Sequence, residues 1–166
     1  MLKRFWERRR DEEGFTLIEL MVVVLIIGIL IAIALPTFLG ARKRAQDRAA
    51  QSDLRNGVAA AKVFFTDNDA YSGTGFAFNT GCGGTGTQTC TSAEAIEPNL
   101  KWIGAANPAV GEVDIAANTA DTVLLVAKSA SATDLYFGIK DVSTSGTFYC
   151  SGTYAVVSVT CAGASW

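Results

Sequence analysis

The chain has 166 residues and a formal net charge of −2, and it contains no histidine. The lack of histidine excludes Ser-His-Asp and Cys-His nucleophile systems and every metal site with histidine ligands. Among enzymes, this leaves those built on carboxylates or lysine alone. No group of residues in the sequence points to one, so we expect a protein that is not an enzyme.

The chain begins with a charged segment, 1–14, which precedes an apolar run over 15–35. At the helical rise, 21 residues span about 30 Å, the thickness of the hydrocarbon core of a bilayer. Glu19 is the one ionisable side chain in this run. A charge inside a membrane is costly and usually functional. We therefore expect Glu19 to pair with a cation that comes from processing or from another molecule.

The position of Gly14 distinguishes this start from an ordinary secretory signal. Such a signal is cleaved after its apolar stretch, whereas Gly14 is a small residue directly before it. Cleavage after Gly14 would leave the helix over 15–35 on the mature protein as an anchor. The alternative is a plain single-pass anchor in which Glu19 is incidental.

The sequence GFTLIE at 14–19 resembles the prepilin signature of type IV pilins and pseudopilins. The resemblance continues through Gly28 to Pro36 and does not extend to the rest of the chain. It implies a prepilin peptidase that cleaves before Phe15 and methylates the new amine. Because that amine would lie one helical turn from Glu19, we expect the two groups to pair between neighbouring copies in a filament.

Gly28 and Pro36 weaken the apolar helix. Proline lacks an N–H and its ring clashes with the carbonyl four residues earlier, so we expect a kink or break near Ala32. Two interpretations stay open: a fixed kink that ends the membrane span, or a segment that unwinds in a polymer and lets the filament stretch. Glu19, Gly28 and Pro36 are thus the candidate assembly residues.

Beyond Pro36 the helix is predicted to resume as an amphipathic half, so that one long helix covers 15–69. An apolar stripe at spacings of four, three and four residues is formed by Leu54, Val58, Ala61 and Phe65. We expect this stripe to pack against a C-terminal sheet, and Gly57 to bend the helix. Residues 40–56 are basic and the part of the chain beyond them is acidic, so no nucleic-acid site is predicted in the head.

Residues 70–111 are rich in glycine, threonine and serine and are predicted to form a connecting loop. No lysine follows its glycines as a phosphate-binding loop requires. We expect Phe76, Phe78 and Trp102 to hold this loop on the core.

From residue 112 onward, alternating apolar and β-branched residues predict an antiparallel sheet over 112–161. The expected strands are 112–116, 122–128, 135–141, 147–150 and 155–160. One face is expected to bury Val123, Leu125, Tyr136 and Val157, or their immediate neighbours, against the helix. The predicted fold is α+β: a leader 1–14, a long N-terminal helix and a globular head over 70–166. The family that the motif resembles has the same architecture.

Four cysteines in a chain with an export-type segment indicate disulfides and place the head outside the cytosol. Of three pairings, Cys82–Cys90 and Cys150–Cys161 are favoured, because each pair is close in sequence and straddles a turn. The second pair also resembles the C-terminal disulfide of many type IV pilins. The alternative is a zinc site, which needs cysteines two to four residues apart, a spacing that the chain lacks.

No cofactor is predicted, with one alternative. Related pseudopilins bind calcium, and Glu112, Asp114 and Asp121 lie in one acidic stretch. Three carboxylates and backbone carbonyls supply enough oxygens for calcium. Acidic residues on an exported domain, however, usually only solvate its surface.

The leading hypothesis is a major pilin that polymerises through its N-terminal helix into a surface filament for adhesion, motility or DNA uptake. Its expected partners are identical subunits, a prepilin peptidase and N-methyltransferase, a membrane assembly platform and, before assembly, the cytoplasmic membrane. A pseudopilin of a type II secretion or competence machine is the alternative. A membrane-tethered binding module is a third hypothesis, but the sequence marks no concave site for it.

Overall fold

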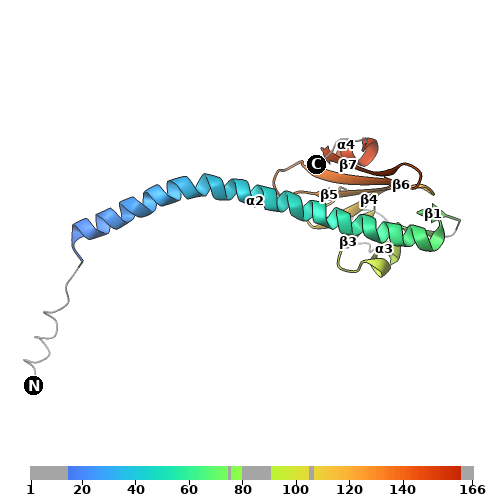
Figure 1. Cartoon of the computed structure of the whole chain (residues 1–166), viewed down its shortest axis with the longest axis horizontal. Coiled ribbons are helices and arrows are strands. Elements are labelled where there is room, and N and C mark those ends of the chain that lie inside the picture. Colours follow the sequence, from blue (N-terminus) through green and yellow to red (C-terminus); the bar gives the residue numbers. More distant parts are fainter. Residues whose placement is uncertain (1–14, 75, 80–90, 105–106, 162–166) are drawn as a thin grey trace, which may run out of the picture. The chain divides into compact units, whose positions relative to one another are not determined.

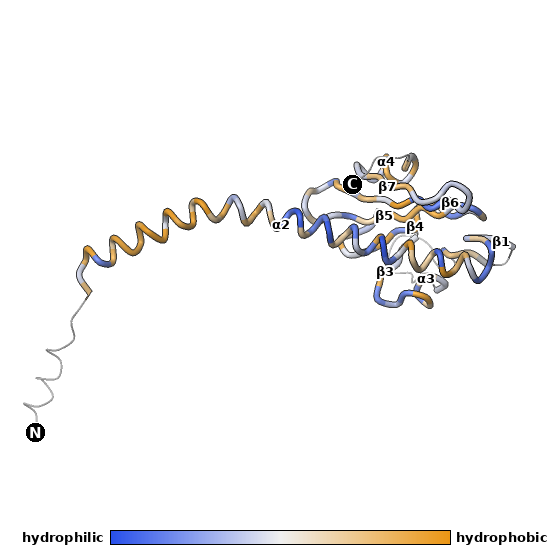
Figure 2. The backbone as a smooth tube through the Cα atoms, viewed as in Figure 1, coloured by the Kyte–Doolittle hydropathy of each residue, from blue (hydrophilic) through white to orange (hydrophobic). Residues whose placement is uncertain are grey.

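The computed structural model describes residues 15–74, 76–79, 91–104 and 107–161. The chain divides into two compact units, 1–41 and 42–166. One helix, α2 (Leu17–Asn68), supplies most of the described part of the first unit and the start of the second (Figure 1). In Figure 2 the first half of α2 is apolar, whereas its second half mixes hydrophilic and hydrophobic residues.

The helix ends at Asn68, one residue before the predicted end at Asp69. Asp69 has a φ of 56°, the left-handed conformation that aspartate tolerates better than most residues. Directly before it, Asn68 Nδ2 donates a hydrogen bond at 2.9 Å to the carbonyl of Phe64, one turn earlier in the helix. These contacts end α2 without a glycine.

The second unit contains a five-stranded sheet. Its strands, in the order in which they lie side by side, are β3 (Lys101–Gly104), β4 (Glu112–Asn118), β5 (Thr122–Lys128), β6 (Tyr136–Val142) and β7 (Gly146–Gly152). Strands β4 to β7 form an antiparallel meander, and β3 pairs in parallel with β4. The predicted α+β fold, a long N-terminal helix with a largely antiparallel sheet, is confirmed.

Two of the predictions for the head are wrong. The segment expected to be a strand at 155–160 is a helix, α4 (Tyr154–Thr160). The expected loop 70–111 contains regular structure: β1 (Ser72–Gly73), β2 (Phe76–Ala77), α3 (Thr91–Ile96) and the parallel strand β3. Strand β3 has only four residues, too few for an alternating pattern to be recognised, and its pairing with β4 is what defines it.

The sheet buries both of its faces in two separate clusters. One face packs against α2, where Leu54 and Ala61 are buried and Val58 and Phe65 lie beside them, as the stripe predicted. Its sheet residues are Trp102, Val113, Ile115, Val123, Leu125, Ala127, Phe137 and Ile139. The other face packs against α4. Val123, Leu125 and Phe137, the neighbour of Tyr136, face α2 as predicted. Tyr136 itself lies in the second cluster, and so does Val157, whose predicted burial against α2 is wrong.

The segment before β3 is held by aromatic contacts. The rings of Phe78 and Trp102 are both buried and meet edge to face with centroids 5.4 Å apart. The side chain of Phe76 lies outside the described residues. Helix α2 runs without interruption past Gly57, where a β-carbon would lie 3.1 Å from Leu125 Cδ1 and 3.2 Å from Trp102 Cη2. Gly57 therefore permits a close approach of helix and sheet.

Candidate functional site

The candidate site is the apolar first part of α2. Among the described residues, α2 is the one helix long and apolar enough to cross a membrane. Every side chain over 15–39 is exposed, including large aliphatic residues on all sides of the helix. A helix that is apolar all round needs lipid or other protein around it.

Glu19 is held at the start of this helix by Thr16. The backbone N–H of Thr16 donates to Glu19 Oε2 at 3.0 Å, and the Thr16 hydroxyl donates to the same oxygen at 2.7 Å. In return, the Glu19 N–H donates to Thr16 Oγ1 at 3.3 Å. This reciprocal arrangement is a capping box, and it satisfies N–H groups that the first helical turn leaves without partners.

Thr16 was not among the residues singled out above. The signal that identifies it is a threonine three residues before a glutamate, directly ahead of an apolar run. The capping box orients the carboxylate back toward the beginning of the helix. Pairing of Glu19 with an amine at Phe15 stays a prediction.

Pro36 lies inside α2, which is continuous across it, so the predicted break near Ala32 is wrong. Close to the proline, the Thr37 hydroxyl donates to the carbonyl of Ile33 at 3.4 Å. Apart from its chain neighbours and the backbone of α2 itself, no atom lies within 4 Å of the position that a β-carbon at Gly28 would take. A kink, or unwinding between Gly28 and Pro36 in a polymer, stays a prediction.

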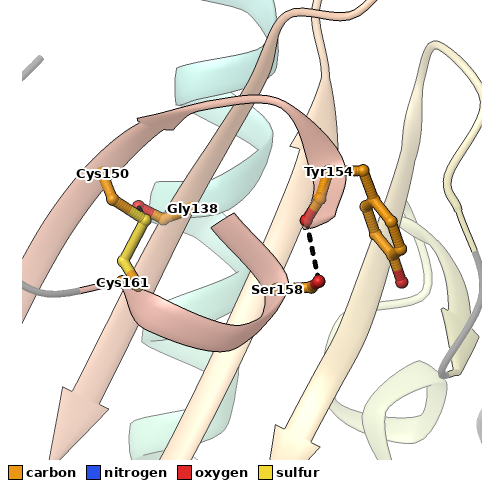
Figure 3. The surroundings of a disulfide bond; sticks show 5 residues. All are labelled: Gly138, Cys150, Tyr154, Ser158 and Cys161. Atoms are coloured by element: carbon orange, nitrogen blue, oxygen red, sulfur yellow. Dashed lines mark hydrogen bonds between the residues drawn. A yellow bond between two sulfur atoms is a disulfide. The ribbon is translucent and has the colours of Figure 1, made fainter. Parts of the chain in front are cut away.

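The disulfide Cys150–Cys161 is present as predicted and joins β7 to the residue after α4 (Figure 3). Both cysteines are buried. Within α4, the Ser158 hydroxyl donates to the carbonyl of Tyr154 at 2.7 Å. The disulfide and α4 thus cover one face of the sheet.

A buried carboxylate, Asp141 on β6, links α2 to the sheet. It accepts hydrogen bonds from the Tyr71 hydroxyl and from Thr147 Oγ1, the latter at 2.5 Å, and its Oδ1 lies 3.3 Å from Lys62 Nζ. Burial acts to raise the pKa of Asp141, but the bonds from Thr147, Tyr71 and Lys62 together hold it below its usual value. Thr147 pairs with Asp141 across the β6–β7 hairpin, but Tyr71 and Lys62 come from distant parts of the chain, so no local pattern could have identified the whole group.

The candidate calcium residues do not come together. Glu112 pairs with Lys101 and accepts from the N–H of Ala109 at 2.8 Å; the Lys101 bond is the main reason that the pKa of Glu112 lies below its usual value. Asp114 is fully buried and accepts from the Tyr154 hydroxyl at 2.8 Å. Asp121 lies beyond the other end of β4, and the part of the chain that the structure describes holds no group of three potential metal ligands.

Comparison with protein families identifies the N-terminal region. Residues 9–35 match the family model described as the prokaryotic N-terminal methylation motif. By this region, the chain is similar to members of the type IV pilin superfamily. The predicted resemblance is confirmed, and the superfamily includes both pilins and pseudopilins.

The similar proteins include some named as pilus subunits and some named as components of type II secretion systems. It is 48% identical over 71 residues to the type IV major pilin protein PilA of Myxococcus xanthus, covering 43% of this chain and 31% of that protein. It is 44% identical over 62 residues to the type IV wide pilus major component PilA4 of Thermus thermophilus, covering 37% of this chain and 47% of that protein. It is 42% identical over 67 residues to the type II secretion system core protein G of Pseudomonas aeruginosa, covering 40% of this chain and 47% of that protein.

The chain thus spans about a third to a half of the length of these curated relatives. No solved structure matches it at a significant level. The predicted processing residue Gly14 and the predicted pair Cys82–Cys90 lie outside the described residues. Phe15 is described and is exposed, next to the capping box.

Proposed function

We propose that this chain is the major structural subunit of a type IV pilus. A prepilin peptidase cleaves the precursor after Gly14 and methylates the new amine of Phe15. The mature chain is held in the cytoplasmic membrane by its N-terminal helix and then assembles with identical copies, at a membrane platform, into a surface filament. Adhesion, motility or DNA uptake are properties of that filament.

The observation that carries this proposal is the exposed apolar surface over 15–39, with a single carboxylate near its beginning. In a membrane, lipid covers this surface; in a filament, the same helices of neighbouring copies cover it. Either environment removes the apolar side chains from water, which is the main favourable term in association. The same helix can therefore move from the lipid of the membrane into the interior of a filament without exposing its apolar side chains to water.

Glu19 supplies the specificity of this assembly. Cleavage converts the peptide nitrogen of Phe15 into an ammonium, the cation that the apolar segment otherwise lacks. An ion pair between copies fixes their register more than it stabilises the filament, because removing both charges from water is costly. Thr16 keeps the carboxylate hydrogen-bonded before that partner exists.

The second candidate function is a pseudopilin of a type II secretion or competence machine. It is favoured by the similarity to type II secretion system core protein G from several bacteria. In that case the chain forms a short fibre inside the cell envelope instead of a surface pilus. Deleting its gene would then abolish protein secretion and leave surface fibres unchanged.

The test is to shear fibres from the surface of producing cells and to determine the N-terminus of this chain by mass spectrometry. We expect N-methylated Phe15. In a matched control, Gly14→Val should block cleavage, leave the precursor in the membrane and remove the chain from the fibres. Fibres in which the chain begins at Met1, or surface fibres without the chain, would contradict the proposal.

A further inference from the structure

The unit formed by 42–166 carries opposite charges at the two ends of its helical segment. Where α2 enters this unit, four basic side chains are exposed: Arg42, Lys43, Arg44 and Arg48. None of the four forms an ion pair with any residue that the structure describes. Arg44 and Arg48 are one turn apart, so they lie on the same side of the helix.

The other end of the same helix is acidic. Asp67 and Asp69 are exposed there, and the last turn of α2 contains no basic residue. The turn between β4 and β5 lies beside them, because the N–H of Tyr71 donates to the carbonyl of Ala120 at 2.9 Å. This contact places the exposed Asp121 at the same end of the unit.

The acidic end is unfavourable for an isolated copy. The C-terminal end of a helix carries a partial negative charge, which favours cations and disfavours carboxylates in the last turn. Asp67 nevertheless lies there, and among the described side chains no cation pairs with it or with Asp121. A cation supplied by another molecule would relieve this repulsion.

We propose that copies of the chain dock head to tail in the filament, with the basic end of one on the acidic end of another. The proposal rests on the polymerisation proposed above and names a second contact between copies, separate from that of Glu19. Arg44 and Arg48 would meet Asp67 and Asp121 of the next copy along the axis. The two patches differ, so the contact leaves a free end of each kind and can repeat along a fibre.

The length of the unit defines which copies can meet. Arg44 and Asp67 are 23 residues apart in one helix, or about 35 Å at a rise of 1.5 Å per residue. Copies related by an axial shift of about this size bring the two ends into contact. Exposed charges are screened within about 8 Å at physiological ionic strength, so the pairs must be in direct contact to act.

The experiment reverses the charge of each end separately and then of both ends in one variant. The basic-end variant is Arg44→Glu with Arg48→Glu, and the acidic-end variant is Asp67→Lys with Asp121→Lys. The swap variant carries all four changes and keeps the net charge of the natural chain. The control is Glu94→Lys, which reverses a partly exposed charge in α3, outside both α2 and the turn between β4 and β5.

The measured quantity is the yield of sheared surface fibres relative to the mature chain in the membrane. Like charges placed face to face repel each other, so each single-end variant should lose at least about tenfold in yield. The swap variant should return to within about threefold of the natural chain, because its ends are again complementary. The control should match the natural chain. An oxidised Cys150–Cys161 bond in the membrane pool will show that each variant has folded.

Three outcomes would overturn the docking proposal. One is a swap variant that yields no more fibre than the poorer single-end variant. Another is a loss confined to the basic-end variant, which would point to anionic lipid headgroups as its partner instead. The third is unchanged yield for every variant while the natural chain forms fibres. By contrast, absence of the natural chain from the fibres would contradict the proposed pilus function itself.

Discussion

Gly138 lies in the middle of β6, beneath α4, and its missing side chain lets this helix approach the sheet. In the sheet it pairs with Val126 on one side and Cys150 on the other. A β-carbon at this position would lie 2.5 Å from Val157 Cγ1 and 2.7 Å from Cys150 Sγ. Both distances are shorter than any ordinary contact, so an added methyl group would displace α4 or the disulfide.

We therefore expect Gly138→Ala to destabilise the head by about 1–3 kcal/mol, the usual cost of an overpacked core. Thermal unfolding of the purified full chain in detergent would measure the change. Gly28→Ala is the control, because it adds the same group where no side chain or other element lies within 4 Å apart from the chain neighbours of Gly28. Equal unfolding temperatures for Gly138→Ala and the natural chain would contradict this account of the α4 contact.

The lowered pKa of Asp141 predicts how the stability of the head changes at acidic pH. Its folded pKa is lowered, so the stability that it contributes is complete above its unfolded pKa of about 4 and is lost as the pH falls through the folded pKa. Asp141→Asn removes the charge that Lys62 pairs with and should lower stability at neutral pH. It should also weaken the loss of stability below about pH 4.

Denaturation curves measured between neutral pH and strong acid would test this expectation. Asp134→Asn is the matched control, because Asp134 is exposed in the turn between β5 and β6. A variant at Asp141 with the same acid dependence as the control would show that another carboxylate governs acid unfolding.

At the scale of elements, α4 shows why a local pattern can predict the wrong structure. Its sequence, YAVVSVT, is rich in β-branched residues, which favour strands in general. Helix α4 nevertheless contacts β4 to β7, and it buries Val157 against the sheet. The disulfide at Cys161 returns the chain to β7 after seven helical residues. Packing and the covalent link therefore override the intrinsic preference of this segment.

Removing the Cys150–Cys161 disulfide should lower the stability of the head by about 2–3 kcal/mol, the value expected for a loop of this length. The two cysteines are 11 residues apart in the sequence. Denaturant unfolding of Cys150→Ser with Cys161→Ser, compared with the natural chain, measures the loss. In the same variant, peptide mapping without reductant should still find Cys82 linked to Cys90. An unchanged midpoint of the unfolding curve would show that the packing of α4 on the sheet is sufficient to hold the C-terminal segment in place.

At the scale of the whole molecule, Glu19 connects processing to assembly. Glu19→Val should be cleaved and retained in the membrane, yet be incorporated poorly into fibres, because the Phe15 ammonium then lacks its partner. Glu19→Gln separates the two roles of this residue. Glutamine keeps an acceptor for the capping box with Thr16 but carries no charge.

If the ion pair between copies matters, Glu19→Gln should lose fibre yield about as strongly as Glu19→Val. Fibre counts by electron microscopy, with the mature chain quantified in the membrane, would measure both. A Glu19→Gln variant with the fibre yield of the natural chain would show that helix capping, and not charge pairing, is the function of this glutamate.

The sequence by itself determined the features that depend on neighbouring residues. The N-terminal motif, the long helix with its apolar stripe, the strand β5 and the Cys150–Cys161 pair all follow from local spacing and periodicity. Only the tertiary structure decided the parallel strand β3, the helix α4, the burial of both sheet faces and the polar group around Asp141. These features arise from contacts between residues far apart in the chain, such as Tyr71 with Asp141, where the energy of packing and hydrogen bonding outweighs the preference of each segment.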